Sequence, residues 1–138
     1  MATASELLDQ IVSTFNDAQW DEAERLMAED GVLEEIGTGR RLNRQENTAN
    51  AKAWKAAFPD ARGVIENRLV AGNQAAGEVV WSGTNTGSLN GMPPTGKGVQ
   101  VRAVLVLTEE GGKIARARHY LDIAGMMGQL GLAPPPPR

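Results

Sequence analysis

The last predicted strand carries the side chains of this sequence that could do chemistry. The stretch from Arg116 to Asp122 reads Arg-Ala-Arg-His-Tyr-Leu-Asp, and it holds the only histidine and the only tyrosine of the chain. A carboxylate, an imidazole and a phenol can together move protons and stabilise a developing negative charge. Asp122, His119 and Tyr120 are therefore the candidate catalytic residues.

A strand with period two places these candidates on opposite faces of a sheet. Tyr120 and Asp122 share one face, where the tyrosine hydroxyl could donate a hydrogen bond to an enolate. His119 faces the other way and would join them only if a bulge turned it. The alternatives to a catalytic role are a structural histidine and a packed tyrosine ring with a solvated hydroxyl.

Asp122 itself has two physical interpretations. As an acid/base it would be desolvated by apolar neighbours, and its pKa would rise. As the N-cap of a helix that begins at Ile123 it would accept backbone N–H bonds, which lower the pKa of a carboxyl. On spacing alone the cap is the simpler interpretation, and both remain open.

Substrate-binding candidates come first from a predicted helix that spans Arg44–Phe58. Asn43 and Glu46 have the spacing of a capping box at its start. Asn50 and Trp54 lie four residues apart and therefore on one face. Asparagines beside a tryptophan on an inward face are unusual for plain core, because buried amides need partners. The alternative is that these asparagines lie on a solvent-exposed face of the helix.

The predicted strands supply the other binding candidates. Trp81 and Asn85 share one face of a strand over Gln74–Thr86, and a tryptophan there offers flat surface to an apolar or polycyclic ligand. Arg102 interrupts the most apolar strand, Val99–Thr108. A charge in that position is costly unless it is paired or faces a polar cavity, so Arg102 belongs either to the pocket or to a subunit interface.

That apolar strand also predicts a homodimer. Neither of its faces is polar, so both should be covered. The helices can cover one face, and a second copy of the chain is the expected cover of the other. A further pair of acids, Glu34 and Glu35, closes the first predicted strand, Val32–Ile36. Adjacent residues point to opposite faces, so at most one of them can face a pocket.

The elements that position these residues follow one another as helices and then strands. Ser5 is the expected cap of a first helix, and a second short helix carries Leu26. From Arg62 onward the pattern is β, with Gly72-Asn73 as a type II′ turn between two strands. Helices followed by a long antiparallel meander indicate an α+β layer fold.

Length and composition limit the possible functions. The 138 residues predict one domain over 1–132, followed by a Pro-rich disordered tail over 133–138. A net charge of −3 without a basic run argues against nucleic acid. No cysteine and one histidine argue against disulfides and a metal site. No signal-peptide pattern or long apolar run is present, so we expect a cytoplasmic protein without a membrane partner.

Several short motifs in this order resemble the SnoaL-like polyketide cyclases, within the superfamily of nuclear transport factor 2 and ketosteroid isomerase. The resemblance spans roughly 5–132. Each motif is weak alone, while their order and spacing are fairly specific. The motifs are Phe58-Pro-Asp60, Gly83-Thr-Asn-Thr-Gly87, Gly91-Met-Pro-Pro-Thr-Gly96, Gly112-Lys-Ile114, Tyr120-Leu-Asp122 and Gln129-Leu-Gly131.

The resemblance implies a cone-shaped, curved antiparallel sheet, an α+β barrel whose N-terminal helices help enclose a pocket. It also implies acid/base ring closure on a polyketide-derived substrate with no metal or cofactor. Asp122 matches the aspartate that serves as acid/base in the family. Asn85 stands where the family often has histidine, which leaves the reaction type open. Epoxide hydrolysis or cyclisation on the same fold, and a non-catalytic binding module, are the alternatives.

Overall fold

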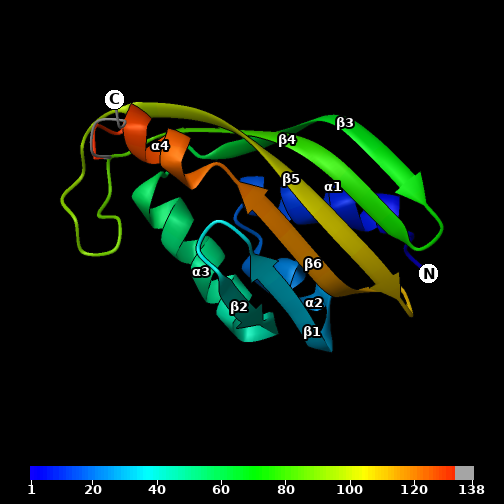
Figure 1. Cartoon of the computed structure of the whole chain (residues 1–138). Helices are drawn as coiled ribbons and strands as arrows, with labels where there is room; N and C mark the ends of the chain where they lie inside the picture. Colours follow the sequence, from blue (N-terminus) through cyan, green and yellow to red (C-terminus); the bar gives the residue numbers. More distant parts are fainter. Residues whose placement is uncertain (133–138) are drawn as a thin grey trace.

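The computed structural model describes residues 1–132, and the tail predicted over 133–138 lies outside them. Two helices come first, two strands and a third helix follow, and a run of four strands leads to a closing helix (Figure 1). The elements in chain order are α1 (Ala4–Asn16), α2 (Trp20–Leu26), β1 (Met27–Glu35), β2 (Arg40–Asn43), α3 (Arg44–Ala57), β3 (Arg62–Ala71), β4 (Gln74–Thr84), β5 (Gly98–Glu110), β6 (Lys113–Leu121) and α4 (Ile123–Gln129).

The strands form one six-stranded sheet in the order β2-β1-β6-β5-β4-β3. Strands β3 to β6 are the predicted antiparallel meander. The sheet as a whole is mixed, however, because β1 pairs with β6 in parallel. It is also not closed into a barrel, since β2 and β3 are free edges. The α+β class and the enclosing helices are confirmed, and the all-antiparallel barrel is corrected to an open, mixed sheet.

Capping explains where the helices begin. Asn43 and Glu46 form the expected capping box of α3, with Glu46 N donating to Asn43 Oδ1 at 2.8 Å and Asn43 N donating to Glu46 Oε1 at 2.9 Å. The first helix begins at Ala4, two residues earlier than a Ser5 cap would place it. Thr3 and Glu6 make the box there, so the predicted cap is corrected to Thr3.

The first strand is longer than its apolar residues indicate. It begins at Met27, and its register with β6 shifts between Met27 and Val32. Gly31 lies in this irregular stretch, where a Cβ would come within 2.9 Å of two carbonyl oxygens. The strand can therefore continue through Asp30-Gly31, a dipeptide that is typical of turns. The turn between β3 and β4 has Gly72 at φ 58°, as the hairpin prediction requires.

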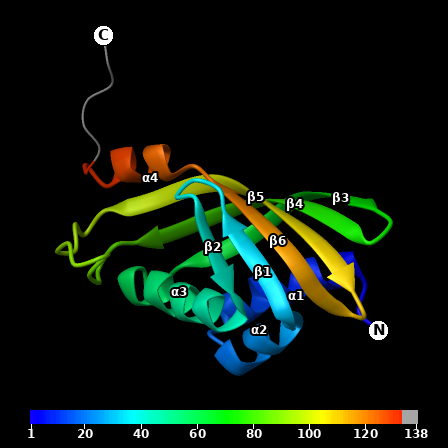
Figure 2. The same ribbon diagram turned by 60° about the horizontal axis from the view of Figure 1, so that its bottom comes forward.

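Helices α1, α2 and α3 lie together on one side of the curved sheet (Figure 2). Helix α1 packs on β3, β4 and β5, while α3 packs on β1 and β2. On β5 the covered side chains alternate, with Leu105 and Leu107 buried and Val104 and Val106 half-exposed on the opposite face. One face of the sheet thus forms the core. In residues 1–132 no helix is long and apolar enough to cross a membrane.

Candidate functional site

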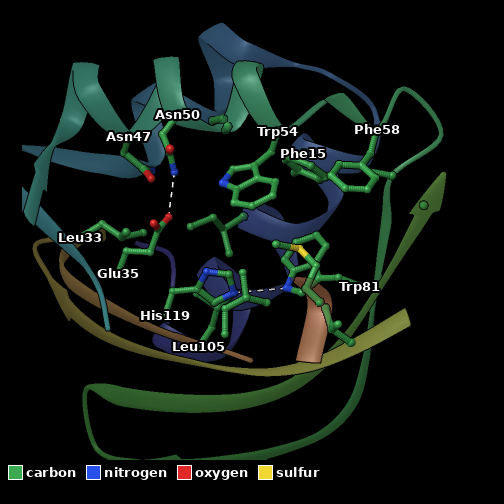
Figure 3. Close-up of a pocket in the computed structure, with 18 of the residues that line it drawn as sticks. Phe15, Leu33, Glu35, Asn47, Asn50, Trp54, Phe58, Trp81, Leu105 and His119 are labelled. Carbon is green, nitrogen blue, oxygen red and sulfur yellow. Dashed lines mark hydrogen bonds between the residues drawn. The ribbon is translucent and has the colours of Figure 1, made fainter. Parts of the chain in front are cut away.

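A pocket lies between α3 and the inner face of the sheet (Figure 3). Its volume is about 150 Å³, and it is neither fully enclosed nor a flat surface. Most of its wall is apolar, with aromatic rings from α3 and β4 and small aliphatic side chains from β1 and β5. The main apolar residues are Leu33, Trp54, Phe58, Trp81 and Leu105. Such a wall suits a compact ligand with little charge.

Polar groups gather at one end of this pocket. Glu35 is 3% exposed, and both of its carboxylate oxygens accept hydrogen bonds. Thr38 Oγ1 donates to Glu35 Oε1 at 2.8 Å, and Asn50 Nδ2 donates to Glu35 Oε2 at 3.0 Å. These two donors hold the carboxylate in a single orientation. Asn47 lies beside them and donates its amide to the Met27 sulfur at 3.4 Å.

A charge outside the pocket orients the Asn50 amide. Arg40 Nη1 donates to Asn50 Oδ1 at 3.0 Å, so the amide nitrogen of Asn50 must face Glu35. The short strand β2 positions Arg40 directly opposite Glu35 in the ladder. Among the described pocket-lining residues Glu35 is the one acid. The same residues include no lysine or arginine, so the carboxylate has no cation beside it in the pocket wall.

His119 faces the same pocket from β6, opposite Glu35 in the parallel β1–β6 ladder. Trp81 Nε1 donates to His119 Nε2 at 3.2 Å, and the two rings meet edge to face. An indole N–H can only donate, so Nε2 is unprotonated and Nδ1 carries the hydrogen. Burial lowers the pKa of His119 from 6.5 to about 4, although nearby Glu35 opposes the shift. At neutral pH the neutral imidazole is a hydrogen-bond donor through Nδ1.

This half-buried imidazole, whose pKa is lowered, should make the fold sensitive to acid. The unfolded chain takes up a proton below about pH 6.5, whereas folded His119 resists it until about pH 4. The free energy of unfolding should therefore fall by about 3 kcal/mol as pH decreases through this window. Urea unfolding across the window tests this for wild type and His119→Phe. Equal pH dependence in the two proteins would contradict the assignment.

The pocket brings together four of the residues predicted from sequence. Asn50, Trp54, Trp81 and His119 all line it. Glu35 also lines the pocket. The side chains of adjacent residues on β1 point to opposite faces, so of the two acids only Glu35 faces inward. Glu34 is on the other side, where Arg116 Nη2 donates to its carboxylate at 2.6 Å.

Asp122 and Tyr120 are not among the pocket-lining residues. Asp122 is the N-cap of α4, and its Oδ1 accepts the Gly125 backbone N–H at 2.8 Å. Tyr120 is 41% exposed and lies on the outer face of the sheet, paired with Val104. The structure thus corrects their predicted place in the pocket: the period-two alternation holds, and it is the His119 face that points inward.

Asn85 is also outside the pocket wall, although it is only 1% exposed. Its amide donates to the Ala57 and Gly87 carbonyl oxygens, and its Oδ1 accepts from the Thr95 N–H and hydroxyl. All four hydrogen-bonding positions are used within the protein. Asn85 therefore links the β4–β5 loop to the end of α3 by hydrogen bonds. Its predicted place in the pocket wall is corrected to this structural position.

Arg102 points away from the pocket as well. It lies on the outer face of β5, where its side chain is 80% exposed and its Nε is 3.6 Å from Glu66 Oε2. The expected place of Arg102 in the pocket is thus corrected, and its expected place at a subunit interface stays a prediction. An inward cluster of aspartate, arginine and tyrosine, which would favour epoxide opening, is not formed by Asp122, Arg102 and Tyr120.

Comparisons with known proteins agree with this architecture. The family model described as SnoaL-like polyketide cyclase matches residues 5–130. No curated protein matches the chain closely enough to indicate a relationship.

Solved structures resemble the whole chain. AclR, a proposed hydroxylase from Streptomyces galilaeus, superposes with a TM-score of 0.84 at 18% identity, covering 98% of this chain and 89% of AclR. IdmH, a proposed polyketide cyclase from Streptomyces antibioticus, gives 0.83 at 24% identity, with 93% and 98% covered. A protein of ketosteroid isomerase-like fold from Catenulispora acidiphila gives 0.80 at 18% identity, with 94% and 95% covered. At these identities the likeness establishes the fold.

Proposed function

Since the chain belongs to the SnoaL-like polyketide cyclase family, we propose that it closes a ring in a small carbonyl substrate by acid/base catalysis without a cofactor. The observation that supports this most is the polar end of the pocket. A carboxylate on Glu35 and an N–H donor on His119 face one small, largely apolar cavity. Removing a proton next to a carbonyl requires one base and one such donor.

The proposed reaction is an intramolecular aldol closure. Glu35 removes a proton from the carbon next to a carbonyl, and His119 Nδ1–H donates to the oxygen that becomes an enolate. The enolate carbon then attacks a second carbonyl carbon, and the oxygen of that carbonyl takes the proton from Glu35. One C–H bond and the π bond of the second carbonyl break, one C–C bond and one O–H bond form, and the first carbonyl is restored. Folding the substrate in the apolar cavity can lower the barrier by roughly 7–11 kcal/mol through orientation.

The cavity also limits what can react there. About 150 Å³ holds a ring the size of benzene, well below the volume that a polycyclic ligand requires. We propose that the reacting carbonyl unit of the substrate enters this cavity and any larger portion remains near its opening. The wall lacks a cation, so the reacting unit is uncharged.

Asp122 provides a sharp test of this assignment. If it caps α4, Asp122→Asn retains an oxygen that accepts the same N–H, so ring closure should proceed at the wild-type rate and stability should change by only a few tenths of a kcal/mol. Product formation from a short acyclic diketone that can close to a six-membered ring measures this. A loss as large as that of Glu35→Gln would return the catalytic role to Asp122.

We further propose that the protein is a homodimer formed through the outer face of the sheet. Half-exposed Val104 and Val106 lie at the centre of this face. Arginines dominate one side of the centre, while Glu66 and Glu78 lie on the other side together with Arg102, whose Nε is 3.6 Å from Glu66 Oε2. The arginines are Arg41, Arg116 and Arg118, grouped around Glu34. A two-fold axis along the central strands would place each arginine group against the acids of the second copy.

Light scattering on the eluted protein tests the dimer. We expect a mass of two chains for the wild type and a shift toward one chain for Glu78→Arg, which places like charges against each other. A mass near 14.7 kDa for the wild type at every concentration would exclude this interface.

A further inference from the structure

The indole nitrogen of Trp54 is a polar group that the proposed acid/base pair does not use. Figure 3 shows this nitrogen turned toward the side of the pocket where Asn50 and Glu35 lie. In the described part of the chain it donates to no protein acceptor, whereas the nitrogen of Trp81 donates to His119. An N–H that borders an apolar cavity gains free energy when a ligand supplies an acceptor.

The Trp54 ring is held before any ligand arrives. It stacks on Phe58, one helical turn later on α3, with ring centroids 6.1 Å apart and an interplanar angle of 27°. His119 is held on the opposite wall by its hydrogen bond from Trp81. The two rings therefore present an N–H each from opposite sides of the pocket, α3 above and β6 below (Figure 3).

We infer that Trp54 is a further catalytic residue, whose indole N–H and the His119 Nδ1–H together bind the oxygen of a planar enolate or phenolate. This inference rests on the proposed function and extends it with a second donor. Two fixed donors stabilise a full negative charge on oxygen more than they stabilise a neutral carbonyl, which is the property that lowers the barrier.

The charge of Glu35 decides when such an anion can bind. In the resting site the carboxylate repels a phenolate, so the wild type favours neutral ligands. Once Glu35 has taken the proton it is neutral, and the pocket can hold one negative charge on the ligand oxygen. Glu35→Gln reproduces this neutral state with an amide of nearly the same shape.

The experiment measures binding of para-nitrophenol and of its methyl ether, para-nitroanisole, to the Glu35→Gln protein. The single ring suits a cavity of about 150 Å³, and the visible absorbance of the anion reports its ionisation directly. In Glu35→Gln the bound phenol should ionise at lower pH than the free phenol. Adding Trp54→Phe should weaken phenolate binding by about tenfold to a hundredfold, as expected for one hydrogen bond to a charged oxygen.

The methyl ether is the matched control, because it has the same ring and no anionic oxygen. Its affinity should be unchanged by Trp54→Phe, since the phenyl ring can still stack on Phe58. Phenolate binding that is equal with and without Trp54→Phe would overturn the inference. Equal losses for phenolate and ether would also overturn it, because Trp54 would then act only as apolar surface.

A second measurement needs no substitution at Trp54. The indole N–H resonance of Trp54 in Glu35→Gln should move downfield when the phenolate binds and should stay in place with the ether. An unmoved resonance at saturation would contradict the donor role. These binding results are independent of turnover, so an inactive protein that binds phenolate through Trp54 would refute the proposed reaction and leave the donor pair intact.

Discussion

Glu35→Gln is expected to lower kcat/KM for ring closure by about 10²–10⁴-fold. The amide fills the space of the carboxylate and can still accept one hydrogen bond, but it cannot take a proton. Thr38 and Asn50 would continue to hold the side chain, so binding of a neutral ligand should change little. Initial rates with a short acyclic diketone, followed by product NMR, measure the effect.

Glu34→Gln is the matched control for this prediction. It is the same chemical change at the adjacent residue, but that carboxylate pairs with Arg116 on the outer face. It should change stability little, because the pair is exposed to solvent, and it should leave the rate unchanged. Equal rates for Glu35→Gln and Glu34→Gln would remove Glu35 from the mechanism.

His119→Phe is expected to lower kcat by about 10²–10³-fold, the effect of removing one donor to a developing oxyanion. The substitution keeps an aromatic ring on β6 and removes the Nδ1–H. Because this donor matters most in the transition state, kcat should fall more than KM rises. Steady-state kinetics with the same diketone separate the two constants.

Trp81→Phe supplies the comparison for His119. It leaves the imidazole in place and removes the hydrogen bond that fixes its tautomer. The loss should be smaller than for His119→Phe, because part of the population still has hydrogen on Nδ1. If Trp81→Phe were the more damaging change, His119 would act as something other than a donor.

The elements could largely be predicted from sequence because their signals are local. The capping box at Asn43 and the glycine of the β3–β4 turn each act within a few residues. The parallel pairing of β1 with β6 could not be predicted in this way, because it joins segments about eighty residues apart. Strand β2 is four residues long and carries no apolar alternation, so it has no pattern to detect.

The site was predicted less completely, for a physical reason that the last strand illustrates. Alternation separates His119 from Asp122 correctly, but it does not say which set points inward. The composition of the two sets does contain that signal. Arg116 and Arg118 share the face of Asp122, and two arginines indicate solvent, whereas buried Ala117 shares the face of His119.

The choice of Glu35 shows the same limit at the first strand. The sequence predicts that one of two adjacent acids can face a pocket, and only the pairing of β1 with β6 identifies which one. Glu35 lies opposite His119 in that ladder, and Glu34 lies opposite Arg118. Long-range pairing thus assembles the acid and the imidazole from residues separated in the chain.

The most direct measurement of the central claim is exchange of the protons next to a carbonyl. The wild-type protein is mixed with cyclohexanone in heavy water, and NMR follows the loss of the α-proton signals. We expect exchange well above the rate in buffer, retained in Glu34→Gln and lost in Glu35→Gln. Exchange at the buffer rate, or exchange that persists without the Glu35 carboxylate, would contradict the claim that this pocket removes a proton next to a carbonyl.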